Sequence, residues 1–206
     1  MMVSLYLLLG VGATAAARMP TDDLGNSNVS VALPDGYTAI PFSMRGAIEP
    51  GGDVMTFTGT VTDIFAQIQG IKPDFTWDDF ESTIPLTGAP HEKILCSIPG
   101  QTPGLRMVLL WGYDYLKTIN QPCQVASGPR KCAMLFCRGN PYKTASIWMC
   151  NDNTTPISRT CEEMADYVID IIGDENCIVD DSKMLSQGQE FDTDGFNIIV
   201  RGGGCD

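Results

Sequence analysis

The most regular pattern of apolar and polar positions in this chain lies between residues 160 and 173. Thr160 and Glu163 have the spacing of a helix capping box, in which each side chain accepts a free backbone N–H of the first turn. We expect a helix that ends at Gly173 and uses Cys161 to attach its buried face to a sheet. Helical spacing predicts the members of that face: Cys161, Met164, Ala165, Val168 and Ile172.

A second helical pattern covers residues 105–120 and ends before Pro122. Gly112 is a weak point in it, because glycine has a low helix propensity. The apolar positions that we expect to form its buried face are Met107, Leu110, Trp111, Tyr115 and Ile119.

Two short apolar runs, residues 132–137 and 146–150, predict strands, because each is too short for a helix. Residues 139–141 (GNP) are typical of a turn, so the two strands should form a hairpin. Cys132 and Cys137 are five residues apart. In a regular strand this spacing places them on opposite faces, and they should bond to different partners.

The remaining strand signals are shorter. Residues 29–33 and 54–64 are rich in β-branched side chains with partial alternation, and both predict strands. Residues 70–81 contain too many turn formers to assign. Residues 196–201 predict the last strand, and we expect the Cys205 that follows to hold a terminus that would otherwise fray.

Together these elements predict an α+β fold, a two-layer disulfide-linked sandwich with an antiparallel sheet and two helices on one face. Residues 96–206 form the predicted cysteine-rich core. Residues 18–95 contain no cysteine, and we expect either strands laid on that core or an extended, pro-like segment.

The N-terminal residues 1–17 predict a cleaved signal peptide, since an apolar run closes on Ala15-Ala16-Ala17. In an exported chain, an even number of cysteines predicts disulfides, here up to four, although spacing leaves 105 pairings open. A zinc site is not expected, because the chain has no CxxC and one histidine. The cysteines are Cys96, Cys123, Cys132, Cys137, Cys150, Cys161, Cys177 and Cys205.

Two sequons, at Asn28 and Asn153, fit the predicted secreted, extracellular location of a glycoprotein. No apolar run in the chain body is long enough to span a membrane, and we expect a monomer. The net charge of −12 and the pI near 4.3 argue against nucleic acid as a partner, because an acidic protein repels phosphate.

Charge is unevenly distributed: residues 91–150 carry seven basic and two acidic side chains, whereas residues 161–206 carry twelve acidic and two basic ones. Internal complementarity between the hairpin and the helix explains this pattern. The alternative is a basic patch that meets an anionic surface, composed of Arg130, Lys131, Arg138 and Lys143.

The pattern of reactive residues predicts no catalytic, cofactor-binding or metal-ligating residue. His91, the only imidazole, is expected in a solvated loop, with a catalytic base as the alternative. Residues 192–195 (DTDG) open like a calcium loop but lack its last ligand, so a plain turn is expected. The acidic pairs 78–79 and 180–181 are expected to be solubilising. Three tryptophans should fill the core, unless one is an exposed ligand platform: Trp77, Trp111 and Trp148.

The C-terminal layout resembles small secreted cysteine-rich proteins of filamentous fungi. The residues that carry it are Cys132 and Cys137, residues 146–153 (SIWMCNDN), the cysteine-led helix, and residues 188–200 (GQEFDTDGFNIIV). The layout over residues 96–206 is similar to the necrosis-inducing-factor and killer-toxin-like α/β sandwich families. This resemblance implies an extracellular, non-enzymatic virulence effector or toxin that acts on a host plant or a competing microbe.

The leading hypothesis is therefore a secreted effector-like or toxin-like protein that recognises a host or microbial surface target. Two alternatives remain. One is a small secreted hydrolase, ribonuclease-like, that uses His91 with a carboxylate. The other is a cell-wall or glycan-binding module that uses a tryptophan.

Overall fold

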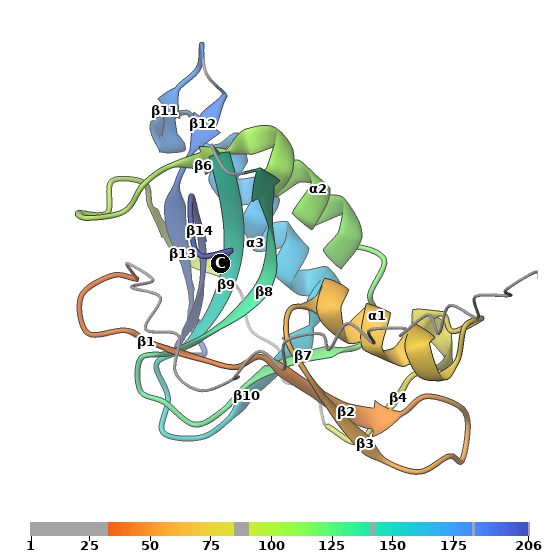
Figure 1. Ribbon diagram of the computed structural model, residues 1–206. Helices are drawn as coiled ribbons and strands as arrows, with labels where there is room; N and C mark the ends of the chain where they lie inside the picture. Colours follow the sequence, from red (N-terminus) through yellow and green to blue (C-terminus); the bar gives the residue numbers. More distant parts are fainter. Residues whose placement is uncertain (1–32, 85–90, 141–142, 183, 206) are drawn as a thin grey trace, which may run out of the picture.

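The computed structural model describes residues 33–84, 91–140, 143–182 and 184–205 (Figure 1). In these residues the chain forms three α-helices and three sheets, joined by mostly antiparallel pairing and cross-linked by four disulfides. The predicted mixture of helices, antiparallel sheet and disulfides is confirmed. The strands are divided among three sheets, however, whereas the sequence predicted one.

The largest sheet has the strand order β1-β8-β9-β14-β13-β5. All its neighbours are antiparallel except β1 and β8, which run parallel. Because β1 and β5 lie at its edges, segments from the N-terminal half close both sides of a sheet composed mainly of C-terminal strands. Its members are β1 (Thr38–Ile40), β5 (His91–Leu95), β8 (Lys131–Asn140), β9 (Lys143–Asn151), β13 (Gly188–Asp192) and β14 (Phe196–Arg201).

The second sheet has the order β10-β7-β2-β3, with β4 paired to β2, and the third has the order β11-β12-β6. Members of the second are β2 (Ser43–Ala47), β3 (Met55–Thr58), β4 (Glu81–Ser82), β7 (Pro122–Val125) and β10 (Ile157–Thr160). Members of the third are β6 (Gly104–Leu105), β11 (Ile178–Asp180) and β12 (Leu185–Ser186). Two 3₁₀ turns, η1 (Trp77–Asp79) and η2 (Glu175–Cys177), complete the elements.

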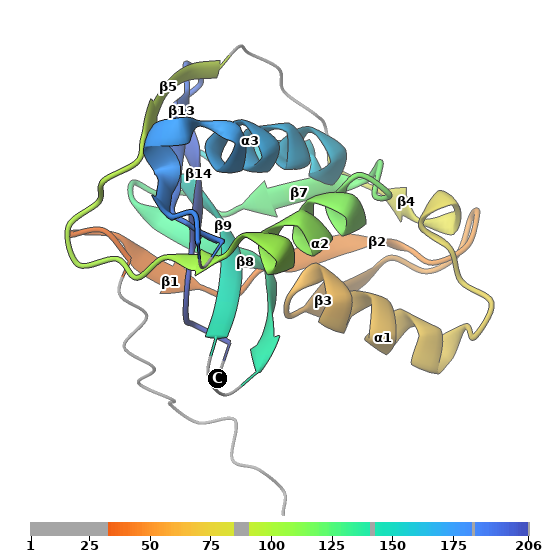
Figure 2. The same cartoon turned by 90° about the horizontal axis from the view of Figure 1, so that it is seen from above.

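The helices α2 (Arg106–Leu116) and α3 (Cys161–Gly173) pack against each other and against the large sheet, as Figures 1 and 2 show. The third helix, α1 (Val61–Ile71), lies beside the second sheet. One apolar cluster unites all of these elements, including buried side chains of the N-terminal half such as Phe57 and Ile64. The described part of residues 18–95 therefore packs into the same core as the cysteine-rich half.

The predicted helix at residues 160–173 is confirmed. Thr160 Oγ1 accepts a hydrogen bond from the Glu163 amide, and the Glu163 carboxylate accepts one from the Thr160 amide. All five residues of the predicted apolar face are buried. Cys161 bonds to Cys123 on β7, so the helix is tied to the second sheet.

The helix predicted at 105–120 is present as α2, and its predicted face is wrong in part: Ile119 is buried and Leu110 and Tyr115 are partly buried, but two members are exposed. Met107 and Trp111 are 55% and 46% exposed, and the helix buries Val108, Leu109, Gly112 and Leu116 instead. Gly112 explains the rotation, because a Cβ there would lie 2.8 Å from a ring carbon of Phe136. The absence of a side chain lets α2 approach the sheet closely along this line.

The strand predicted at 54–64 is wrong beyond residue 58, because β3 ends there and α1 begins at Val61. Gly59 has a φ of +135°, which leaves the extended conformation. Thr60 and Asp63 then form a capping box that starts the helix. The strand predicted at 29–33, the signal peptide and Asn28 lie outside the described residues, apart from Leu33.

The predicted hairpin is confirmed as β8 and β9, and its turn lies partly outside the described residues. Cys132 bonds to Cys150 and Cys137 to Cys205, so the two cysteines do have different partners. The register nevertheless places both on one face. A bulge between Met134 and Phe136 adds one residue to β8 and reverses the alternation that follows it.

Candidate functional site

Three side chains from three elements meet at one edge of the large sheet. His91 Nδ1 lies 2.8 Å from Glu190 Oε1 and 3.1 Å from Asp170 Oδ2. The three donor atoms all lie within 4.8 Å of one another. We call these residues, which come from β5, α3 and β13, the His91 cluster.

The pairing of β5 with β13 explains how His91 reaches this position. Ile94 pairs with Glu190, and His91 pairs with Asp192, with a register shift between the two pairs. His91 and Ile94 are three residues apart, and in a regular strand they would point to opposite faces. The register shift places His91 on the same face as Ile94, which is the face that α3 covers. His91 therefore begins a strand, so the loop predicted for it is wrong, whereas its predicted exposure to solvent is confirmed.

Tyr167 of α3 fixes the orientation of the imidazole. The His91 and Tyr167 rings are stacked, with centroids 3.8 Å apart. The Tyr167 hydroxyl donates to Asp192, and burial followed by this carboxylate raises the pKa of Tyr167 far above its ordinary range. Arg159 Nη2 in turn lies 3.6 Å from Asp192 Oδ1 and 2.5 Å from Asp194 Oδ2. The ring that supports His91 is thus held by buried charges.

Glu190 is the buried member of the cluster, with 3% of its surface exposed. Loss of solvation raises its pKa from 4.5 to about 7, although the nearby His91 imidazole works against this shift. Its Oε2 atom is buried and has no hydrogen-bond partner among the described residues. A buried carboxylate oxygen without a partner is costly, so it requires an explanation.

Glu190 and Asp170 were not singled out from the sequence. Glu190 lies in a strand, β13, that is itself mostly polar, so the sequence offered no local signal for it. Asp170 follows Tyr167 by three residues, so both lie on one side of α3, but nothing local indicated that His91 faces them.

A second polar network lies on the other face of β13 and β14. Tyr37 donates to Asp152 at 3.0 Å, and Asn197 Nδ2 donates to Asp152 at 2.8 Å and to Tyr37 at 3.1 Å. Gln189 Nε2 donates to Asn197 Oδ1 at 2.9 Å. Burial, followed by the Asp152 carboxylate, raises the pKa of Tyr37 to about 12. We call these four residues the Tyr37 network.

Residues 192–195 form the turn between β13 and β14, as the sequence predicts. The Asp194 amide donates to Asp192 Oδ1, and both carboxylates face Arg159. The other acidic pairs serve local structure or solvation: Asp79 pairs with Lys72 at 3.0 Å, and Asp181 is exposed.

Of the three tryptophans, Trp77 and Trp148 are buried and Trp111 is exposed. The Arg138 guanidinium lies over the Trp111 ring at 5.1 Å from its centroid. This pair borders a hollow of about 470 Å³ between α1, α2 and β8. We call it the Trp111 hollow, and its lining is Thr62, Trp111, Asp114, Tyr115, Thr118, Phe136 and Arg138.

The basic residues of the alternative patch are spread along β8. Arg130 and Lys131 lie at its start and Arg138 near its end, about 20 Å away at 3.3 Å per residue. A single patch of these three residues is therefore wrong, since strand geometry separates them. The side chain of Lys143 lies outside the described residues.

Asn153, the second predicted glycan acceptor, uses its Nδ2 atom within the fold. This nitrogen donates to the backbone oxygens of Asp194 at 2.6 Å and Gly195 at 3.1 Å. Glycosylation at Asn153 stays a prediction, and a glycan there would have to displace at least one of these hydrogen bonds.

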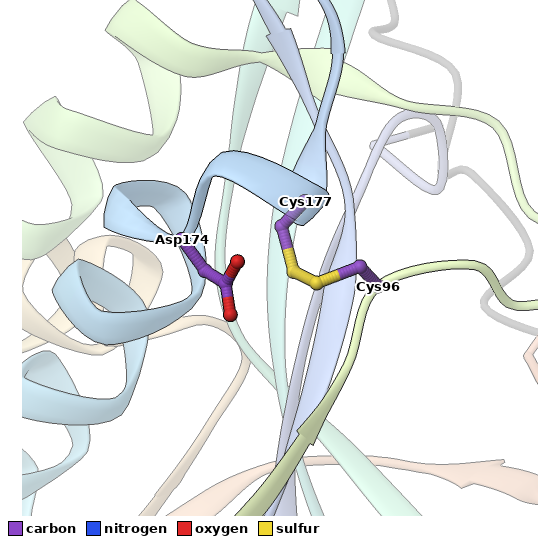
Figure 3. Close-up of side chains that lie close together, drawn as sticks. All are labelled: Cys96, Asp174 and Cys177. Carbon is purple, nitrogen blue, oxygen red and sulfur yellow. A yellow bond between two sulfur atoms is a disulfide. The ribbon is translucent and has the colours of Figure 1, made fainter.

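All eight predicted disulfide cysteines are paired, and the fourth bond joins Cys96 to Cys177. Asp174 lies beside this disulfide, as Figure 3 shows. The group has the residue types of a metal site, but its sulfurs are bonded to each other and offer no thiolate. It therefore serves as a cross-link between the end of β5 and η2.

Comparisons with protein-family models, curated proteins and solved structures find no match to this chain. Within the described ranges, none of the helices is both long and apolar enough to cross a bilayer.

Proposed function

We propose that this protein is a secreted effector or toxin that recognises a target on a host or a competing microbe. Four disulfides support an extracellular location, because cross-links limit the local unfolding that proteases require. The two-layer sandwich predicted from the order of the elements and the fungal source that the resemblance implied belong to this proposal.

The Trp111 hollow is the observation that favours recognition. Trp, Tyr and Arg are the side chains that most often dominate binding energy, and the hollow contains one of each. Trp111 remains 46% exposed on a helix whose other face is fully packed. A large, half-exposed aromatic ring with a guanidinium beside it is suited to a partner that covers both.

The test compares leaf infiltration of the oxidised protein with that of a Trp111→Ala variant. We expect cell death or defence induction from the wild-type protein and a loss of most of it in the variant. Ile71→Ala is the matched control, since Ile71 is an apolar residue at the end of α1 that is 58% exposed. Equal responses to wild type and Trp111→Ala would reject the hollow as the recognition surface.

A glycan-binding module is a second candidate that the same hollow supports. Sugars stack on exposed aromatic rings, and their hydroxyls donate hydrogen bonds to carboxylates and accept them from guanidinium groups. Asp114 and Arg138 flank Trp111 and supply one group of each kind. A glycan array probed with wild type and Trp111→Ala separates the two candidates. Binding that depends on Trp111 would favour the module, and a blank array would favour a protein target.

A further inference from the structure

We propose that the His91 cluster binds one divalent cation of the zinc class, with His91 Nδ1, Asp170 Oδ2 and Glu190 Oε1 as its protein ligands. The site is separate from the Trp111 hollow and does not depend on the proposed recognition function. Water would complete the coordination shell, since two of the three residues are exposed and one side of the cluster faces solvent.

The distances within the cluster are close to those of a metal centre. Ligand atoms 2.0–2.2 Å from one tetrahedral Zn²⁺ lie about 3.3–3.6 Å apart, so binding requires these side chains to separate by a few tenths of an ångström. The nitrogen–oxygen distances here are 2.8 and 3.1 Å. One imidazole with two carboxylates is a mixed donor set suited to zinc and its neighbours, whereas magnesium and calcium prefer oxygen alone.

Hydrogen bonding alone leaves the cluster incomplete. His91 Nδ1 carries at most one hydrogen, yet two carboxylate oxygens converge on it. That hydrogen makes a full hydrogen bond to only one of them, or is shared by both in a weaker three-centre bond. A cation accepts electron pairs from all three atoms at once.

The charge balance points in the same direction. Arg159 is committed to Asp192 and Asp194, and Lys117 to Glu162 and Asp166 at the other end of α3. Among the described residues, Asp170 and Glu190 have ion-pair contacts to His91 alone. A buried carboxylate beside a second carboxylate is stabilised by a dication.

The surroundings also hold the ligands in place before a cation arrives. Tyr167 stacks on the His91 ring and is fixed by its hydrogen bond to Asp192. The Cys96–Cys177 disulfide attaches the far end of β5 to η2, directly after α3. A cation at His91 would attach the near end, so the edge strand would be fastened at both ends.

The experiment titrates Zn²⁺ into the chelator-treated protein with its four disulfides intact, followed by calorimetry and by long-range ¹H–¹⁵N spectra. The chain has one histidine, so the spectra report a single imidazole. We expect one Zn²⁺ per chain, with a shift of the His91 Nδ1 resonance that saturates at that ratio. Amide exchange in β5 should slow on binding.

Variants assign the ligands. His91→Ala and Asp170→Asn, both at exposed positions, should weaken binding roughly tenfold or more. Asp166→Asn is the matched control, because Asp166 lies one turn earlier on α3 and pairs with Lys117. The proposal is overturned by an absence of saturable binding to wild type, by undiminished affinity in His91→Ala, or by a resonance shift confined to Nε2.

Discussion

The His91 cluster and the Tyr37 network lie on opposite faces of the large sheet and share one strand, β13, but they differ in how completely their polar atoms are paired. In the Tyr37 network, every side chain that faces another has a hydrogen bond of ordinary length, and one carboxylate receives two donors. In the His91 cluster, two carboxylates compete for one nitrogen and one buried oxygen has no partner.

We interpret this difference as one between a structural group and the cation site proposed above. A satisfied buried network stabilises a unique packing, whereas an unsatisfied one lowers stability unless something outside the chain completes it. Adjacent residues show the contrast directly, because Gln189 belongs to the first group and Glu190 to the second. Four experiments test this difference between the two groups.

The largest effect should come from the disulfides beside each group. Cys96→Ala/Cys177→Ala opens a loop of 81 residues and should lower the free energy of unfolding by about 4 kcal/mol. Cys132→Ala/Cys150→Ala opens a loop of 18 residues and should cost about 3 kcal/mol. Urea unfolding measures both, and only the first should disturb the His91 resonances. Equal disturbance would contradict the separation of the two faces.

Replacing Asn197, the centre of the Tyr37 network, should lower the free energy of unfolding by about 2–3 kcal/mol. Asn197 is fully buried, and Asn197→Ala leaves Gln189, Asp152 and Tyr37 each without one partner. Urea unfolding gives the value, and Asp181→Asn, at an exposed position, serves as the control. A loss of under about 0.5 kcal/mol would show that the network does not stabilise the fold.

The metal-free protein should lose stability as the pH rises. The folded pKa of Glu190, about 7, lies above its ordinary 4.5, so the folded state holds this proton more tightly than the unfolded chain. The resulting stability is complete below pH 4.5 and disappears as the pH passes 7. With chelator present, the free energy of unfolding should fall by on the order of 2 kcal/mol as the pH rises from 4.5 past 7, and Glu190→Gln should reduce this decline. An unchanged slope in that variant would contradict the assignment.

The smallest effect should come from Tyr37→Phe. The variant keeps the ring and removes one hydroxyl that donates to Asp152, while Asn197 continues to donate to the same carboxylate. We expect a loss of about 1 kcal/mol in urea unfolding. A loss as large as that of Asn197→Ala would mean that the hydroxyl, and not the amide, is the centre of the network.

Elements with strong local signals were predicted from the sequence. The helix that begins after Thr160 was predicted from cap to last residue, because its signals are local: a capping box, a single apolar face and a terminal glycine. The β8–β9 hairpin and β14 were predicted for the same reason. The bulge in β8 was not, since an extra residue leaves no local mark in an apolar run.

The rotation of α2 shows a different failure. Its sequence carries apolar residues on more than one side, and the pattern favoured the side with the large rings. The sheet selected the side with Gly112, because close contact with Phe136 requires an absent side chain. Trp111 was left exposed as a consequence, and the proposed recognition surface exists only because of that selection.

The sequence by itself determined the cysteine inventory, the class of fold and the elements whose signals lie within one turn or one strand. The tertiary structure alone decided which cysteines pair, which side of α2 is buried and which polar residues meet. His91, Asp170 and Glu190 lie far apart along the chain, and the edge pairing of β5 with β13 beneath α3 brings them within 4.8 Å. Local patterns specify elements, whereas contacts between distant residues depend on register, bulges and packing, which the whole core selects together.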